Sequence, residues 1–135
     1  MLIGRTEESP VKTKPGVDVE TLTSIAPSTL EDSFVYVHCH YHPPGDEVLI
    51  RIWNTTYLVD KASGSKSRLL HAENISIAPV WTQVPRGAAY SFLLIFEGLP
   101  KSCQLFDLIE DIPQPGGFEA RGISRNVKDV YHIPI

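Results

Sequence analysis

Short runs in which apolar and polar residues alternate are the feature of this chain that most constrains its fold. From residue 34 onward these runs are separated by proline- and glycine-containing turns at intervals of roughly 8–12 residues. Side chains two positions apart lie on the same face of a strand, so each run predicts a strand with one buried face. The expected strands comprise residues 34–40, 48–53, 56–60, 67–72, 75–81, 89–96, 103–109, 118–123 and 130–135.

The number and spacing of these runs predict an all-β fold. About eight or nine short strands with tight turns are typical of a two-sheet antiparallel sandwich of the immunoglobulin-like kind. A jelly-roll or cupin-like barrel is the alternative that the same pattern allows. Residues 34–40 and 48–53 are expected to form one hairpin, and residues 56–60 and 67–72 a second. Residues 89–96 are apolar on both faces, which predicts a central strand.

The chain is expected to contain one domain preceded by a less regular segment. Residues 1–30 contain three prolines and little sustained periodicity, so they predict an N-terminal arm or linker. Residues 31–135 predict the β-sandwich domain. A chain of 135 residues is long enough to bury one hydrophobic core.

Charge and hydropathy argue against two kinds of partner. The chain has 12 basic and 16 acidic residues and a net charge of −4, whereas a nucleic-acid-binding surface needs a basic excess. No window approaches the ~18 consecutive apolar residues that span a bilayer. The first eight residues lack the apolar stretch of a secretory signal. The sequence as written therefore predicts a cytoplasmic protein, and an exported one if an engineered start replaces a removed signal.

The most suggestive local pattern is a cluster of histidines near the first expected strand. Residues His38, His40 and His42 alternate along it and Glu47 follows, so the histidines are expected to share one face. Imidazole and carboxylate ligands suit one divalent transition metal. The simpler interpretation is a set of exposed histidines at the end of a strand.

Three of these residues, His40, His42 and Glu47, are similar to the first metal-binding motif of cupins. The second cupin motif is matched only in part, because Tyr90 stands where the ligand histidine belongs. The glycines that flank the cupin motifs are also missing, and Phe34 occupies one of these places. The resemblance implies a metal site made by His40, His42 and Glu47, with His38 as a further candidate.

Other catalytic patterns are weak. The chain contains no Gly-x-Ser-x-Gly elbow, and Cys39 is expected on the core face, away from the neighbouring histidines. Cys39 and Cys103 allow either one disulfide in an oxidising compartment or two buried free thiols, and the sequence does not decide between them. The carboxylates of Glu110 and Asp111 are expected to be solvated at a turn.

Three segments in the C-terminal half resemble a group of uncharacterised β-sandwich domains that are common in Bacteroidota bacteria. These segments are residues 81–87, 92–100 and 106–110. The resemblance covers roughly residues 34–135 and implies an immunoglobulin-like sandwich. It implies no activity and no catalytic residues. Members of this group often follow an export signal, and this chain departs from that pattern.

The absence of a complete catalytic or cofactor motif favours a non-enzymatic interaction or assembly module, with a protein partner or a second copy of the chain. The alternatives are a cupin-like metal-binding protein or enzyme and a carbohydrate-binding module. A carbohydrate would need several exposed aromatic side chains on one surface. Trp53 is the best candidate for an exposed or interface aromatic, and the other candidates are Tyr57, Trp81, Tyr90 and Phe92.

Overall fold

The described part of the protein is built from β-strands and loops. The computed structural model describes residues 34–43, 48–85, 87 and 89–135, and these contain no helix. Their strands are β1 (Val35–Tyr41), β2 (Val48–Ile50), β3 (Thr56–Asp60), β4 (Lys66–Glu73), β5 (Thr82–Val84), β6 (Tyr90–Phe96), β7 (Leu105–Glu110), β8 (Glu119–Ser124) and β9 (Val130–Pro134). The all-β prediction is confirmed. The predicted arm, residues 1–30, lies outside the described residues.

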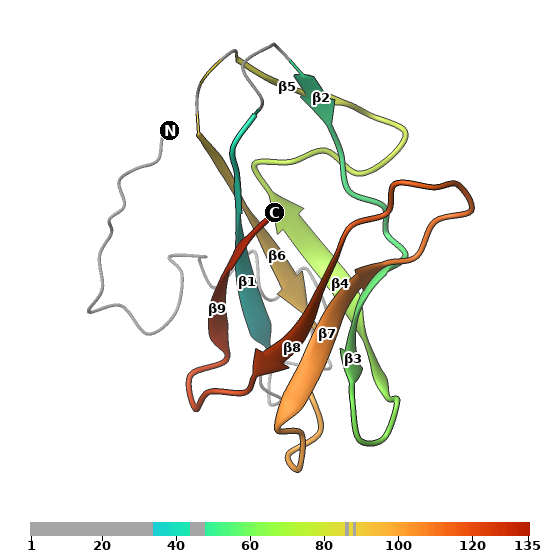
Figure 1. The fold of residues 1–135 in the computed structure, drawn as a ribbon, viewed down its shortest axis with the longest axis vertical. Coiled ribbons are helices and arrows are strands. Elements are labelled where there is room, and N and C mark those ends of the chain that lie inside the picture. Colours follow the sequence, from blue (N-terminus) through green and yellow to red (C-terminus); the bar gives the residue numbers. More distant parts are fainter. Residues whose placement is uncertain (1–33, 44–47, 86, 88) are drawn as a thin grey trace.

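Seven of these strands form one sheet that is nearly closed like a barrel. The strand order is β8-β7-β3-β4-β6-β1-β9, and every neighbouring pair is antiparallel except β1 and β9. Strands β2 and β5 pair separately as a small sheet at one end of the molecule (Figure 1). In the described ranges, no helix has the length and hydropathy that crossing a bilayer requires.

The predicted pairing holds for one hairpin and fails for the other. Strands β3 and β4 pair as expected, and β6 is a central strand between β4 and β1. The predicted hairpin between residues 34–40 and 48–53 is wrong, because β1 pairs with β6 and β9 whereas β2 pairs with β5. Pairing β1 with β6 places two strands with apolar side chains on both faces side by side, which buries more apolar surface than a three-residue partner offers.

The predicted strand over residues 75–81 is also wrong. Ile77 makes only an isolated bridge to Ile52, and the chain then turns through Ala78 and Pro79. Proline has no backbone N–H to donate to a ladder, so it ends pairing at this point. The strand of this region, β5, starts after the turn at Thr82.

Alternation along β1 and β6 creates two apolar clusters on opposite sides of the sheet. Val35, Val37 and Cys39 of β1 belong to the main hydrophobic core, together with alternate side chains of β6 such as Leu94. The other face holds a smaller cluster of Phe34, Tyr36, Leu93 and Ile95. Cys39 and Cys103 are both buried and free, so the structure has two thiols rather than a disulfide.

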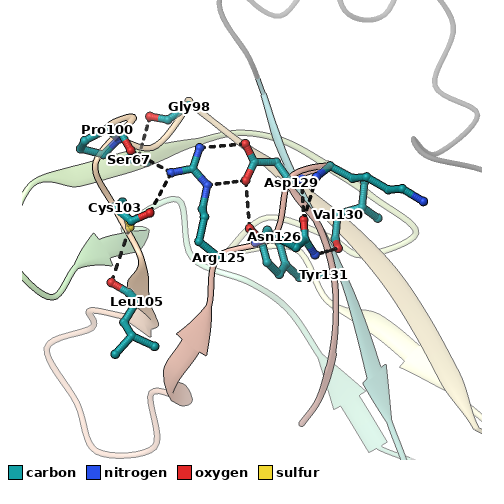
Figure 2. A network of polar contacts seen from close by, with 11 residues as sticks. Ser67, Gly98, Pro100, Cys103, Leu105, Arg125, Asn126, Asp129, Val130 and Tyr131 are labelled. Atoms are coloured by element: carbon teal, nitrogen blue, oxygen red, sulfur yellow. Dashed lines mark hydrogen bonds and ion pairs between the residues drawn. The ribbon is translucent and has the colours of Figure 1, made fainter.

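A buried ion pair holds the turn between β8 and β9. The Arg125 guanidinium donates from Nε to Asp129 Oδ1 (2.6 Å) and from Nη2 to Oδ2 (3.0 Å), as Figure 2 shows. Its Nη1 donates to the carbonyl oxygens of Pro100 (2.8 Å) and Cys103 (3.4 Å). The pair therefore joins the β8–β9 turn to the loop that precedes β7.

Tyr131 and Asn126 complete this network (Figure 2). The Tyr131 hydroxyl donates to Asp129 Oδ1 (2.9 Å) and accepts the backbone N–H of Asn126 (3.0 Å), while Asn126 Oδ1 accepts the backbone N–H of Asp129 (2.7 Å). Burial raises the pKa of Tyr131 to about 12. The turn thus fixes the direction in which β9 begins. β9 runs parallel to β1, with Val130 opposite Tyr36.

Removing the cation of this pair should destabilise the fold strongly. In Arg125→Met the largely buried Asp129 carboxylate loses its charged partner, which typically costs about 3 kcal/mol. Urea unfolding is the measurement. The matched control is Arg68→Met, whose pair with Glu97 is exposed and screened by solvent, so its loss should change stability much less. Equal losses in the two variants would contradict the structural role given to Arg125.

Candidate functional site

The predicted histidines of β1 lie on the outer face of the sheet. Val35, Val37 and Cys39 fill the inner positions, so His38 and His40 alternate outward, where a cupin-like barrel would need them inside. His42 is exposed just after the strand. Glu47, the predicted carboxylate ligand, lies outside the described residues.

The structure adds a histidine that the sequence did not associate with this group. The parallel register places His132 of β9 opposite His38, and its ring lies near-parallel to that of His38 with centroids 4.7 Å apart. His132 Nδ1 lies 3.1 Å from His40 Nε2, and His40 Nδ1 lies 2.8 Å from Ser91 Oγ. We call His38, His40 and His132 the histidine cluster. The only sequence signal for His132 is its alternation with buried neighbours in the last strand.

These imidazoles are neutral near pH 7. Burial, aided by the neighbouring His132 and His40, lowers the pKa of His38 to about 4. Burial also lowers the pKa of His40, with His132 and His42 contributing, and the pKa of His132. A neutral pair can share one N–H···N hydrogen bond, so His40 and His132 satisfy each other without a charge.

The histidine cluster is not arranged as a metal centre. Within the described ranges, no three or more His, Cys, Asp or Glu side chains are positioned to hold one ion. His40 Nε2 and His132 Nδ1 are engaged with each other, and the Cys39 thiol points into the core, where burial raises its pKa. The ligand set His40, His42 and Glu47 stays a prediction.

A second region, at the end of the molecule that carries β2 and β5, contains a cavity of about 270 Å³. We call it the small-sheet cavity. Its apolar lining consists of Leu49, Ile50, Ile52, Ile75, Phe92, Ile112, Phe118 and Ile135. Tyr41, Trp53 and Trp81 add aromatic rings, and Arg51 and Glu110 add opposite charges. An apolar cavity with a few converging polar groups is typical of a binding site.

The Arg51 guanidinium lies over the rings of both tryptophans of this cavity. Its guanidinium carbon is 3.9 Å from the centroid of Trp81 and 5.4 Å from that of Trp53, and Nη1 donates to the Pro79 carbonyl (3.2 Å). Such cation–π contacts hold the guanidinium in a defined orientation. Trp53, the predicted exposed or interface aromatic, is half-buried, and Trp81 is the more exposed tryptophan at 49%.

Glu110 organises the wall of the cavity opposite the small sheet. The prediction of a solvated pair is correct for Asp111 and wrong for Glu110, which is half-buried. Its carboxylate accepts the backbone N–H groups of Trp53 (3.1 Å) and Phe118 (3.3 Å), and burial raises its pKa despite these bonds. Gly117 lies so close to the Glu110 carbonyl that a Cβ would not fit, which explains a glycine here.

Four large apolar side chains are exposed around the small sheet, next to the cavity. Leu49 belongs to β2, Trp81 precedes β5, and Ile77 and Val80 lie in the turn just before Trp81. Their exposed fractions are 57%, 49%, 37% and 61%, respectively. We call these four side chains the small-sheet face. The sequence did not predict it, because residues 75–81 were assigned to a strand.

Comparison with protein-family models, curated proteins and solved structures finds no match for this chain. The resemblance to β-sandwich domains of Bacteroidota therefore stays a prediction. Functional inference depends on the geometry of the two regions above.

The histidine cluster predicts a pH dependence of stability. Because the folded pKa of His38 is about 4, below the ordinary value of about 6.5, only the unfolded chain takes up this proton between those pH values. The free energy of unfolding therefore has its full value above about pH 6.5 and decreases as the pH drops towards 4. The decrease is on the order of 2 kcal/mol for a partly buried imidazole.

Urea unfolding at several pH values tests this dependence. His38→Gln should flatten the loss of stability between about pH 6.5 and pH 4, the range that the shifted pKa defines. The control is His71→Gln, because His71 lies on β4 outside the cluster. A wild-type profile in both variants would show that His38 does not cause the effect.

Proposed function

We propose that this chain is a non-catalytic interaction module that holds a protein partner on the small-sheet face. The observation that carries the proposal is that Leu49 and Trp81 are exposed and line an open cavity, while Ile77 and Val80 are exposed in the turn just before Trp81. Single exposed apolar residues are ordinary on soluble proteins, but a contiguous exposed patch is typical of an interaction surface.

The composition of the region supports a protein partner. Tryptophan and arginine are enriched among residues that contribute most to protein–protein binding, and Trp81, Trp53 and Arg51 lie together here. The apolar cavity offers a place for an anchoring side chain of the partner. A different protein is favoured over a second copy of this chain. A protruding side chain of the partner would fill the cavity, whereas a flat contact between two identical surfaces would leave it empty.

The immunoglobulin-like sandwich expected from the sequence is part of this proposal. In such sandwiches the loops at the ends of the sheets carry the binding surfaces. The small sheet and its turns lie at one end of the seven-stranded sheet, which agrees with this use of the fold (Figure 1). A relationship to the β-sandwich domains of Bacteroidota is part of the same proposal.

Selection from a random peptide library displayed on phage tests the proposal. Peptides enriched on the wild-type protein should bind Trp81→Ala at least about tenfold more weakly, as expected for a central aromatic contact. The control is Val127→Ala in the β8–β9 turn, since Val127 is 99% exposed and remote from the small sheet. It should bind like the wild type.

Two results would overturn the proposal. One is a selection that enriches no peptide sensitive to Trp81→Ala. The other is a glycan array on which a sugar binds and is lost in Trp81→Ala, which would make the two tryptophans a carbohydrate platform instead.

The alternative of a metal protein makes a different prediction. A cupin-like site would retain about one equivalent of a divalent transition metal after dialysis, and His40→Ala would remove it. An interaction module should give substoichiometric metal that does not change in His40→Ala. Elemental analysis of tag-free protein measures this, with His71→Ala as the control for a histidine of another strand.

A further inference from the structure

Arg51 is a cation with unused hydrogen-bonding capacity in a preorganised position. Within the described residues no carboxylate lies within ion-pair distance of it, and its single hydrogen bond is the one from Nη1 to Pro79. A guanidinium carries several N–H donors in a planar fork, so most of them remain available. The guanidinium carbon lies over the rings of both Trp81 and Trp53, which hold it at the cavity.

The nearby acid, Glu110, interacts electrostatically with Arg51 but does not lie within ion-pair distance of it. Glu110 also lines the cavity, but its two oxygens accept the backbone N–H groups of Trp53 and Phe118. Its carboxylate is therefore held by the β7 side of the cavity. Arg51 therefore supplies free N–H donors beside the cavity, and these match an anionic or acceptor group on the ligand.

The size and lining of the cavity define the rest of the ligand. A volume of about 270 Å³ lies just below the range of about 300–1,000 Å³ that takes drug-sized molecules. Ile52, Phe92 and Phe118 contribute apolar surface to it. This space suits one large apolar side chain, with Leu49 and Trp81 exposed for the flanking residues.

We infer that the partner binds as a peptide segment in which a carboxylate, held by Arg51, stands next to a large apolar side chain that enters the small-sheet cavity. Arg51 would bind the carboxylate through two parallel N–H···O bonds, because a guanidinium fork matches that geometry. The apolar side chain supplies buried area, and the carboxylate supplies selectivity. This inference rests on the proposed function, since it names the chemistry of the partner for the same face.

Trp53 and Trp81 are the chain's two tryptophans and both flank Arg51, so their fluorescence reports on the site directly. Three capped synthetic peptides serve as probes: one with adjacent phenylalanine and glutamate, one with phenylalanine and glutamine, and one with alanine and glutamate. The first should bind the wild-type protein at least about tenfold more tightly than either of the others, the range expected for one charge-assisted contact or one buried aromatic ring.

The Arg51→Gln variant separates charge from packing. It should bind the glutamate and glutamine peptides with equal affinity, because the partner of the carboxylate is gone. Arg68→Gln is the control, since Arg68 lies on β4 and pairs with Glu97. The peptide comparison on the wild-type protein stands without any variant, so a folding defect in Arg51→Gln does not remove the test.

The outcomes distinguish the two proposals. Equal affinity of the wild-type protein for the glutamate and glutamine peptides, with both lost in Trp81→Ala, overturns the carboxylate inference and leaves the interaction surface standing. Equal affinity for the phenylalanine and alanine peptides overturns the apolar anchor. Failure of all three peptides, together with a library selection that enriches nothing, overturns the proposed function itself.

Discussion

The ion pair between Arg125 and Asp129 fixes the turn from which the last strand, β9, enters the sheet. It joins the turn after β8 to the loop before β7, and Tyr131 and Asn126 bind to the same network. Strand β9 is an edge strand with one neighbour, β1. A strand that is hydrogen-bonded on one side alone gains stability when its ends are fixed. The β8–β9 turn fixes the first end of β9, just before its parallel pairing with β1 begins.

The parallel pairing of β9 has a chemical consequence far along the sequence. It places His132 beside His38 and His40, so that three of the chain's five histidines share one surface. Burial and mutual repulsion keep these imidazoles neutral, and His40 and His132 hydrogen-bond to each other. His38 and His40, two of the predicted ligand residues, thus form a contact between β1 and β9 through His132.

Two arginines, Arg125 and Arg51, use their guanidinium groups in different ways. The first binds a carboxylate and two carbonyl groups within the protein, so its hydrogen-bonding capacity is used internally. The second is oriented by two indole rings and keeps most of its donors free beside an apolar cavity. A cation that is fixed but not paired is suited to recognition, because little conformational entropy is lost when a ligand arrives.

The sequence alone determined the secondary-structure class, most of the strands and the buried face of β1. These follow from alternation with a period of two and from proline and glycine at turns, and both are properties of neighbouring residues. Only the tertiary structure decided that β1 joins β6 and β9, that His132 completes the histidine cluster, and that Glu110 is half-buried. It alone also brought Arg51, Trp53 and Trp81 into one site. The physical reason is that strand pairing depends on the total apolar surface that distant segments bury together. The pattern of neighbouring residues does not determine that total.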